Sequence, residues 1–182
     1  GPLSEVNKKY FHGKNKIWED MVNHPNYDAF WQARTPLPHL KNVQPAVMVV
    51  GGLFDAQDLY GPLKTYAAIK KNNPDAVNHL VMGPWRHGGW ARRDGERYQD
   101  IYFGQKTAVY YRGKIELPFF NHYLKDKPDP GLSEATIFLT GSNQWRTFDQ
   151  WPPKEVTPKS LYLQPNGELS FAVPTGTDDY EA

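Results

Sequence analysis

The sequence predicts an α/β fold in which a parallel β-unit is followed by a run of short β-strands. Residues 45–52 and 78–83 are short apolar runs that end in glycine, and a stretch of helical periodicity separates them. Apolar runs of this length, bounded by turn residues, are typical of strands buried in a parallel sheet. We therefore expect a strand, a crossover helix and a second, parallel strand. After residue 132, short apolar stretches alternate with Gly, Pro and Asn turns, which indicates a β-sandwich.

The helices are predicted from apolar spacing and from the residues that begin or end them. In residues 5–34, apolar side chains at helical spacing stop before Pro25, and a short aromatic-rich helix is expected beyond it. A helix over residues 58–71 can be capped by Asp58, because an Asp carboxylate accepts hydrogen bonds from the first free N–H groups of a helix. A third helical region is expected at residues 105–124.

A polar, proline-rich linker at residues 126–132 divides the chain into two predicted domains. The first, residues 1–125, has two parallel strands, and the second, residues 133–182, has four short strands against roughly eight in a jelly-roll sandwich. Since such sheets leave edges and faces uncovered, we expect a segment of a longer polypeptide, completed by further residues, a second copy or another chain. The four strands are expected at residues 135–140, 146–148, 160–163 and 168–173.

Composition excludes several classes of function. Lys and Arg total 21 against 20 acidic residues, a net charge of +1 that gives no electrostatic basis for binding nucleic acid or an anionic membrane. No apolar run approaches the roughly 18 residues that span a bilayer. The absence of cysteine excludes disulfides, thiolate zinc sites and a cysteine nucleophile. We therefore expect no nucleic-acid partner and no membrane partner.

Two residues that can carry acid–base chemistry follow the two expected strands. Asp55 comes shortly after Gly52, and His87 comes shortly after Gly83. The carboxyl ends of parallel strands meet at one edge of the sheet, where ligands bind in open α/β sheets, so we expect the two side chains to pair. An Asp that accepts the Nδ1 proton of a His fixes its tautomer and stabilises the imidazolium, as in a nucleophilic triad. The alternative is that Asp55 only caps the next helix and that His87 is an ordinary loop residue.

The serine of such a triad is not recognisable in this sequence. The chain has no Gly-x-Ser-x-Gly motif, and in α/β-hydrolases the order along the chain is Ser, then Asp or Glu, then His. We therefore expect the nucleophile to lie upstream of Gly1. The serines of the chain lack the context of a nucleophile: Ser4, Ser133, Ser142, Ser160 and Ser170.

Several longer motifs occur in order along most of the chain. They are residues 24–31 (HPNYDAFW), 52–61 (GLFDAQDLYG), 80–87 (LVMGPWRH) and 118–124, then Thr140-Gly141, Trp145, Trp151-Pro152, 161–163, Gly167 and Leu169-Ser170. Together they resemble the α-amino-acid ester hydrolases and glutaryl-7-aminocephalosporanic acid acylase-like proteins, within the wider group of cocaine esterase and the X-Pro dipeptidyl-peptidases.

This resemblance implies a serine hydrolase with an α/β-hydrolase domain, a helical cap and a C-terminal jelly-roll domain. Residues 1–125 would be the C-terminal part of the hydrolase domain with a remnant of the cap, and residues 133–182 would be the start of the jelly roll. Asp55 would be the triad acid and His87 the general base. The implied substrates are small-molecule esters or amides, and no cofactor or metal is expected. Self-association and a periplasmic or secreted bacterial location are further expectations from the resemblance.

Substrate preference depends on the residues beside the triad acid. In α-amino-acid ester hydrolases a carboxylate cluster, Asp-x-Glu-Asp, holds the α-ammonium group of the substrate; here Gln57 replaces the Glu and Asp58 is kept. Gln57 lacks the charge that makes a hydrogen bond to an ammonium group about twice as strong, so the α-amino preference is in question. Asp58, Gln57 and Trp85 are the candidate substrate-binding residues, with helix capping for Asp58 and core packing for Trp85 as the alternatives.

The loop at residues 86–99 carries several positive charges. Arg86, Arg92 and Arg93 are expected to be solvated, with contact to a substrate carboxylate as the alternative. Two other classes of function remain open beside the serine esterase or amidase and its dipeptidyl-peptidase or carboxylesterase variants. The first is a β-rich binding module without chemistry, and the second is a metal hydrolase with Asp55, Asp58 and His87 as ligands.

Overall fold

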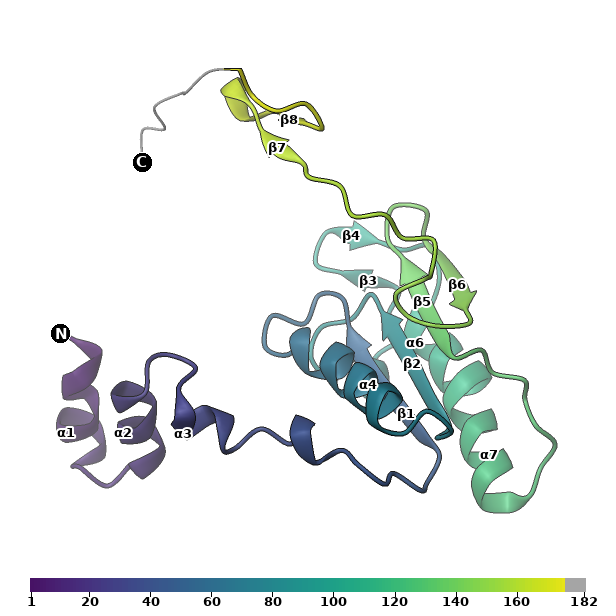
Figure 1. Ribbon diagram of the computed structural model, residues 1–182, viewed down its shortest axis with the longest axis horizontal. Coiled ribbons are helices and arrows are strands. Elements are labelled where there is room, and N and C mark those ends of the chain that lie inside the picture. The colour runs from purple at the N-terminus through teal and green to yellow at the C-terminus, as the bar shows by residue number, and fades with distance from the viewer. Residues whose placement is uncertain (176–182) are drawn as a thin grey trace.

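A computed structural model describes residues 1–175 of the chain, and its centre is a four-stranded mixed sheet (Figure 1). The strand order is β1-β2-β5-β6, with β1, β2 and β5 parallel and β6 antiparallel to β5. The predicted strand–helix–strand unit is confirmed, since a helix connects the parallel strands β1 and β2. The strands are β1 (Val47–Gly52), β2 (Asn78–Gly83), β5 (Ala135–Leu139) and β6 (Gln144–Phe148).

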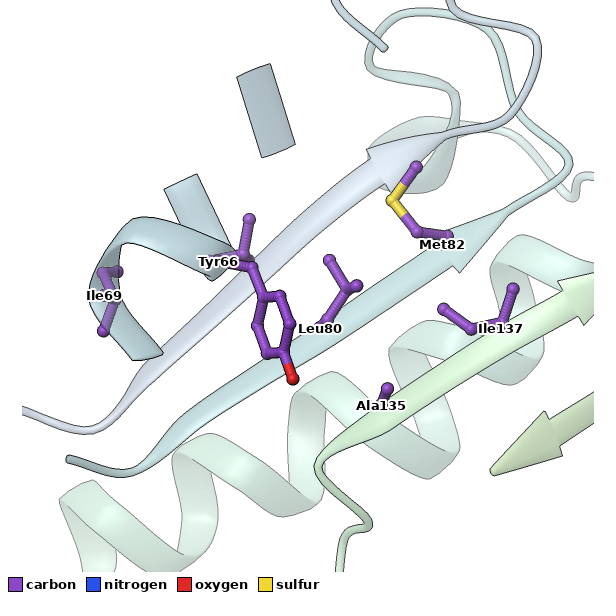
Figure 2. Close-up of a cluster of buried hydrophobic side chains, with 7 residues drawn as sticks. Tyr66, Ile69, Leu80, Met82, Ala135 and Ile137 are labelled. Atoms are coloured by element: carbon purple, nitrogen blue, oxygen red, sulfur yellow. The ribbon is translucent and has the colours of Figure 1, made fainter. Parts of the chain in front are cut away.

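Helices cover both faces of this sheet. Because side chains alternate along a strand, Leu80 and Met82 pack on one face against α4, whereas Val81 packs on the other face. Figure 2 shows the first cluster, in which Tyr66 of α4 lies over residues of β2 and β5. The helices are α4 (Tyr60–Asn72) on the first face and, on the second, α6 (Thr107–Tyr111), a π-helical turn (Arg112–Glu116) and α7 (Leu117–Lys125).

The N-terminal helices lie away from the sheet (Figure 1). None of their residues is buried. The segment that connects them to β1 contains the short 3-10 turn η2 (Leu37–His39). The predicted end of the helical pattern before Pro25 is confirmed. The elements are η1 (Leu3–Glu5), α1 (Val6–Phe11), α2 (Lys16–Asn23) and α3 (Ala29–Gln32).

The structure corrects the predicted position of the domain boundary. Strand β5, expected to begin a separate sandwich, instead pairs in parallel with β2, and β6 pairs with β5. The linker at residues 126–132 therefore connects α7 to the same sheet. The reason lies in the residues of β5: four of its five side chains are buried, as a central strand between two helical layers requires.

Residues beyond β6 form a separate small element. Strands β7 (Tyr162–Leu163) and β8 (Leu169–Ser170) pair antiparallel around the 3-10 turn η4 (Pro165–Gly167) and lie away from the main sheet (Figure 1). The jelly-roll assignment stays a prediction, and residues 176–182 of that predicted domain lie outside the described residues. Among residues 1–175, no helix is both long and apolar enough to cross a bilayer.

Candidate active site

The turns that follow β1 and β2 are hydrogen-bonded to each other. Leu53 N donates to Gly83 O at 2.8 Å, and Phe54 N donates to Trp85 O at 3.1 Å. Gly52 is needed for this approach, because a Cβ atom at that position would lie 2.2 Å from Trp85 O. These hydrogen bonds therefore bring Asp55, which follows Phe54, beside the segment that follows Trp85 and contains His87.

Asp55 and His87 pair at this junction. His87 Nδ1 lies 2.9 Å from Asp55 Oδ2, and the other carboxylate oxygen, Oδ1, accepts the backbone N–H groups of Gln57 at 2.9 Å and Asp58 at 3.0 Å. The Asp55 side chain is 3% exposed, whereas that of His87 is 62% exposed. The carboxylate is thus buried and fully engaged, and the imidazole is open to a substrate.

The pKa of Asp55 reflects two opposing influences. Burial raises it, but the hydrogen bonds from Gln57 N, from His87 and from Asp58 N outweigh burial and hold the pKa below its ordinary value. Hydrogen bonds to a carboxylate stabilise its charged form, so Asp55 is ionised at neutral pH. An ionised Asp55 can only accept, so in the neutral form of His87 the ring proton is on Nδ1 and Nε2 is an acceptor. This is the state that a general base requires.

Gln57 and Asp58 lie beside this pair and are exposed. Asp58 Oδ1 accepts Gly61 N at 2.8 Å in the first turn of α4, although Leu59, and not Asp58 as predicted, occupies the N-cap position. The metal-hydrolase alternative needs Asp55, Asp58 and His87 to converge. No group of three His, Cys, Asp or Glu side chains is placed to hold a metal ion within the described part of the chain.

Trp85 packs in the core, the alternative considered for it, and it also lines the cavity described below, so its substrate-binding role stays a prediction. The residue is 2% exposed and packs between Tyr111 and Trp145, with ring centroids 5.4 and 5.8 Å away. Its Nε1 donates to the hydroxyl of Thr107 at 2.8 Å. Trp85 therefore anchors the backbone two residues before His87.

A cavity of about 540 Å³ is lined by Arg86 and Gly89, which flank His87 in sequence, but not by His87 or Asp55 themselves. It lies where the predicted loop forms a short helix, α5 (Gly89–Arg92), and a hairpin of β3 (Arg97–Tyr98) and β4 (Ile101–Tyr102). Arg86 and Arg93 line this cavity, whereas Arg92 does not. The lining consists of Pro84, Trp85, Arg86, Gly89, Arg93, Asp94, Gly95, Arg97, Tyr98 and Gln99.

Comparisons with known proteins identify the hydrolases to which this chain is similar. The model of the X-Pro dipeptidyl-peptidase (S15) family matches residues 3–89, which contain both Asp55 and His87. Cocaine esterase from Rhodococcus sp. (strain MB1 Bresler) is 26% identical over 166 residues, 88% of this chain and 27% of that protein. The chain is related to these hydrolases.

Two solved structures extend the relationship to the fold. The structure of an α-amino acid ester hydrolase matches with a TM-score of 0.87 and 32% identity, over 100% of this chain and 31% of that one. An aminopeptidase from the marine sediment archaeon Thaumarchaeota archaeon matches with a TM-score of 0.80 and 34% identity, over 91% of this chain and 27% of that one. The predicted resemblance to this group of hydrolases is confirmed, as is the α/β class. The chain spans about 30% of the length of these relatives.

Sequence reasoning missed one residue of this chain, Thr107, that supports the candidate site. Thr107 is fully buried, accepts from Trp85 Nε1 and donates to Gly95 O at 2.6 Å. It joins the segment that carries His87 to the loop on the opposite wall of the cavity. A threonine at the start of a predicted helix gives no signal of such a role, because both of its partners are distant in sequence.

Proposed function

We propose that the polypeptide containing this chain is a serine hydrolase that cleaves or transfers acyl groups of small-molecule esters or amides. Asp55 orients the imidazole and His87 is the general base. The observation that carries the proposal is the 2.9 Å contact between a buried, ionised carboxylate and an exposed imidazole whose second nitrogen is free to accept a proton. The relationship to an ester hydrolase, an esterase and a peptidase family supports the same reaction class.

The reaction needs a serine that residues upstream of this chain would contribute. His87 Nε2 takes the serine proton as the hydroxyl attacks the substrate carbonyl, and Asp55 stabilises the imidazolium that forms. His87 then gives this proton to the leaving alcohol or amine, and water resolves the acyl-enzyme by the same route in reverse. Within residues 1–175, no serine hydroxyl is hydrogen-bonded to His87. We therefore expect the isolated chain to be inactive.

The acyl preference follows from the residues beside Asp55. Gln57 is exposed and uncharged, and the Asp58 carboxylate is engaged by Gly61 N. A substrate α-ammonium group would therefore meet one partly engaged carboxylate instead of a charged cluster. We propose that the enzyme does not require an α-amino group and that neutral acyl groups are accepted.

The test uses the longest natural polypeptide that contains this chain. We expect a fluorophosphonate to label one serine outside residues 1–182, and His87→Ala to lower both the labelling rate and kcat/KM for 4-nitrophenyl acetate by about a thousandfold or more. The matched control is His39→Ala, since His39 is an exposed histidine away from Asp55. A His87→Ala protein with the activity of the control would overturn the assignment, and a wild type without labelling would favour a binding module.

A further inference from the structure

The cavity beside His87 is lined by an excess of positive charge. Arg86, Arg93 and Arg97 line it, against the single carboxylate of Asp94. All three arginines are exposed, and none has a side-chain hydrogen bond or an ion pair with any residue in the described range 1–175. The cavity therefore presents guanidinium donors that the chain itself does not use.

The position of this cavity relates it to the reaction. Arg86 directly precedes His87, and Gly89 lies two residues after it; both line the cavity. A subsite in this space requires that a substrate with its scissile carbonyl at His87 extends past Arg86 and Gly89. A volume of about 540 Å³ holds a group of several carbon atoms with a charged end.

The walls that carry these arginines are held by buried hydrogen bonds. Thr107 links Trp85, which precedes Arg86, to the carbonyl of Gly95 on the other wall. Gly95 has φ +74°, and a Cβ atom there would lie 2.5 Å from Thr107 Oγ1, so only glycine allows this contact.

The backbone of Arg93 is held in a second way. The side chain of Arg112 donates to Trp90 O at 2.6 Å and to Arg93 O at 2.8 Å. The arginine-bearing backbone is thus ordered before a ligand arrives, which lowers the entropy cost of binding.

An apolar surface completes the cavity. Tyr98 lines it and stacks on Phe54, the residue before Asp55, with ring centroids 4.8 Å apart. An aromatic ring beside guanidinium groups suits a ligand with a hydrocarbon or aryl body and an anionic end.

We propose that this cavity is a subsite for a carboxylate group on the substrate, held by Arg86, Arg93 and Arg97. The inference rests on the proposed function, since it places the subsite next to the general base. Guanidinium groups bind carboxylates with charge-assisted, often bidentate hydrogen bonds, which gives a charged substrate an advantage over its neutral ester.

The experiment compares matched ester pairs in the longest natural polypeptide. Mono-4-nitrophenyl adipate and its methyl ester place the carboxylate on the acyl side; 4-acetoxybenzoate and its methyl ester place it on the leaving group. We expect kcat/KM to favour the anionic member of one pair by about tenfold, and the preferred pair identifies which half of the substrate enters the cavity. The preference should fall as salt concentration rises.

The variants assign this preference to the cavity. The triple variant Arg86→Gln, Arg93→Gln, Arg97→Gln should bring the anionic-to-neutral ratio close to one. The matched control is Arg92→Gln, which removes the same charge from the same segment outside the cavity lining. If the triple variant does not fold, each single variant should lower the ratio by about threefold. A wild-type ratio near one in both pairs, or a ratio that changes equally in the Arg92→Gln control, would overturn the proposal.

Failure of the subsite and failure of the enzyme assignment give different results. Hydrolysis of the neutral esters without charge preference overturns the subsite alone. If no ester is hydrolysed, the proposed function fails, and calorimetry with adipate and benzoate then decides on the subsite. Binding that the triple variant loses and Arg92→Gln keeps would support it, and absence of binding would overturn it.

Discussion

Two carboxylates with basic or phenolic partners lie at opposite ends of the same sheet. Asp55 follows the carboxyl end of β1 and pairs with His87, whereas Glu134 precedes β5 and accepts hydrogen bonds from Tyr66 and Lys70. Each carboxylate is at least half-buried. Both clusters therefore contain the residue types that acid–base catalysis uses.

The partners decide what each pair can do. Tyr66 is 1% exposed, and its hydroxyl, which donates to Glu134, also accepts Trp151 N at 3.1 Å. Burial, with the hydrogen bond to Glu134, raises the pKa of Tyr66 to about 12, so this proton stays in place at neutral pH. His87 instead exposes its second nitrogen. We infer that a pair suited to acid–base chemistry has a free, solvent-accessible atom on the base, whereas a closed cluster stabilises the fold.

Removing each carboxylate charge should separate the two roles. In the longest natural polypeptide, we expect Asp55→Asn to lower kcat by about ten-thousandfold, because an amide favours the wrong tautomer of His87. Glu134→Gln should instead lower the free energy of unfolding by about 1–3 kcal/mol, since it weakens two hydrogen bonds to a charged acceptor. Ester hydrolysis and urea unfolding measure the two effects. Equal activity losses in the two variants would show that both act through the fold.

The carboxyl end also depends on a neutral hydrogen-bonded contact. Thr107→Val keeps the shape of the side chain but leaves Trp85 Nε1 and Gly95 O without their partner, so we expect a loss of about 3 kcal/mol in unfolding free energy. Thr107→Ser keeps the hydroxyl and should recover most of that loss. A Thr107→Ser protein as unstable as Thr107→Val would mean that the methyl group, and not the hydrogen bonds, matters here.

The sequence predicted the half of the fold that local pattern determines. β1, α4 and β2 follow from apolar runs and helical spacing, and the pairing of Asp55 with His87 follows because both come after parallel strands. The addition of β5 to the sheet was missed. Its apolar run is as continuous as that of β1, but the prolines at 128 and 130 favour a linker before it. Strand order also depends on pairing between residues far apart in sequence.

The residues that support the candidate site could not be predicted from local sequence pattern for a related reason. Thr107 and Trp85 are 22 residues apart, and neither has a sequence signature for their contact. The lining of the cavity by Arg93 and Arg97 depends on the path of a loop that has no periodicity. The pairing of Asp55 with His87 at the strand ends can thus be predicted from sequence, whereas the residues that position this pair require the tertiary structure.

The two pairs should also respond to opposite ends of the pH scale. The pKa of Tyr66 is raised in the folded protein, so its contribution to stability is complete below about pH 10 and is lost as pH rises towards 12. Tyr66→Phe should be less stable than wild type at neutral pH, with a deficit that shrinks between those two values. Unfolding by urea at a series of pH values measures this. A deficit that stays constant would place the Tyr66 effect in packing alone.

Asp55 provides the acid counterpart in the same experiment. Its pKa is lowered in the folded protein, so its contribution is present above about pH 4 and is lost as pH falls through the folded-state value. The stability deficit of Asp55→Asn should therefore shrink on acidification and be independent of pH on the alkaline side. A deficit that instead shrinks towards alkaline pH would contradict the assignment of the charge to Asp55.

The smallest effect is expected where charge can be added to the exposed rim of the site. Gln57→Glu places a second carboxylate next to Asp58, and we expect it to raise kcat/KM for an α-amino ester relative to the matching neutral ester by about threefold, because exposed charges are screened by solvent. Gln57→Ala removes the amide without adding charge and should leave this ratio unchanged. The comparison is made with phenylglycine methyl ester and phenylacetic acid methyl ester at low salt. A ratio that rises equally in both variants would assign the change to the loss of the Gln57 amide, and the α-ammonium group would then have to be bound elsewhere.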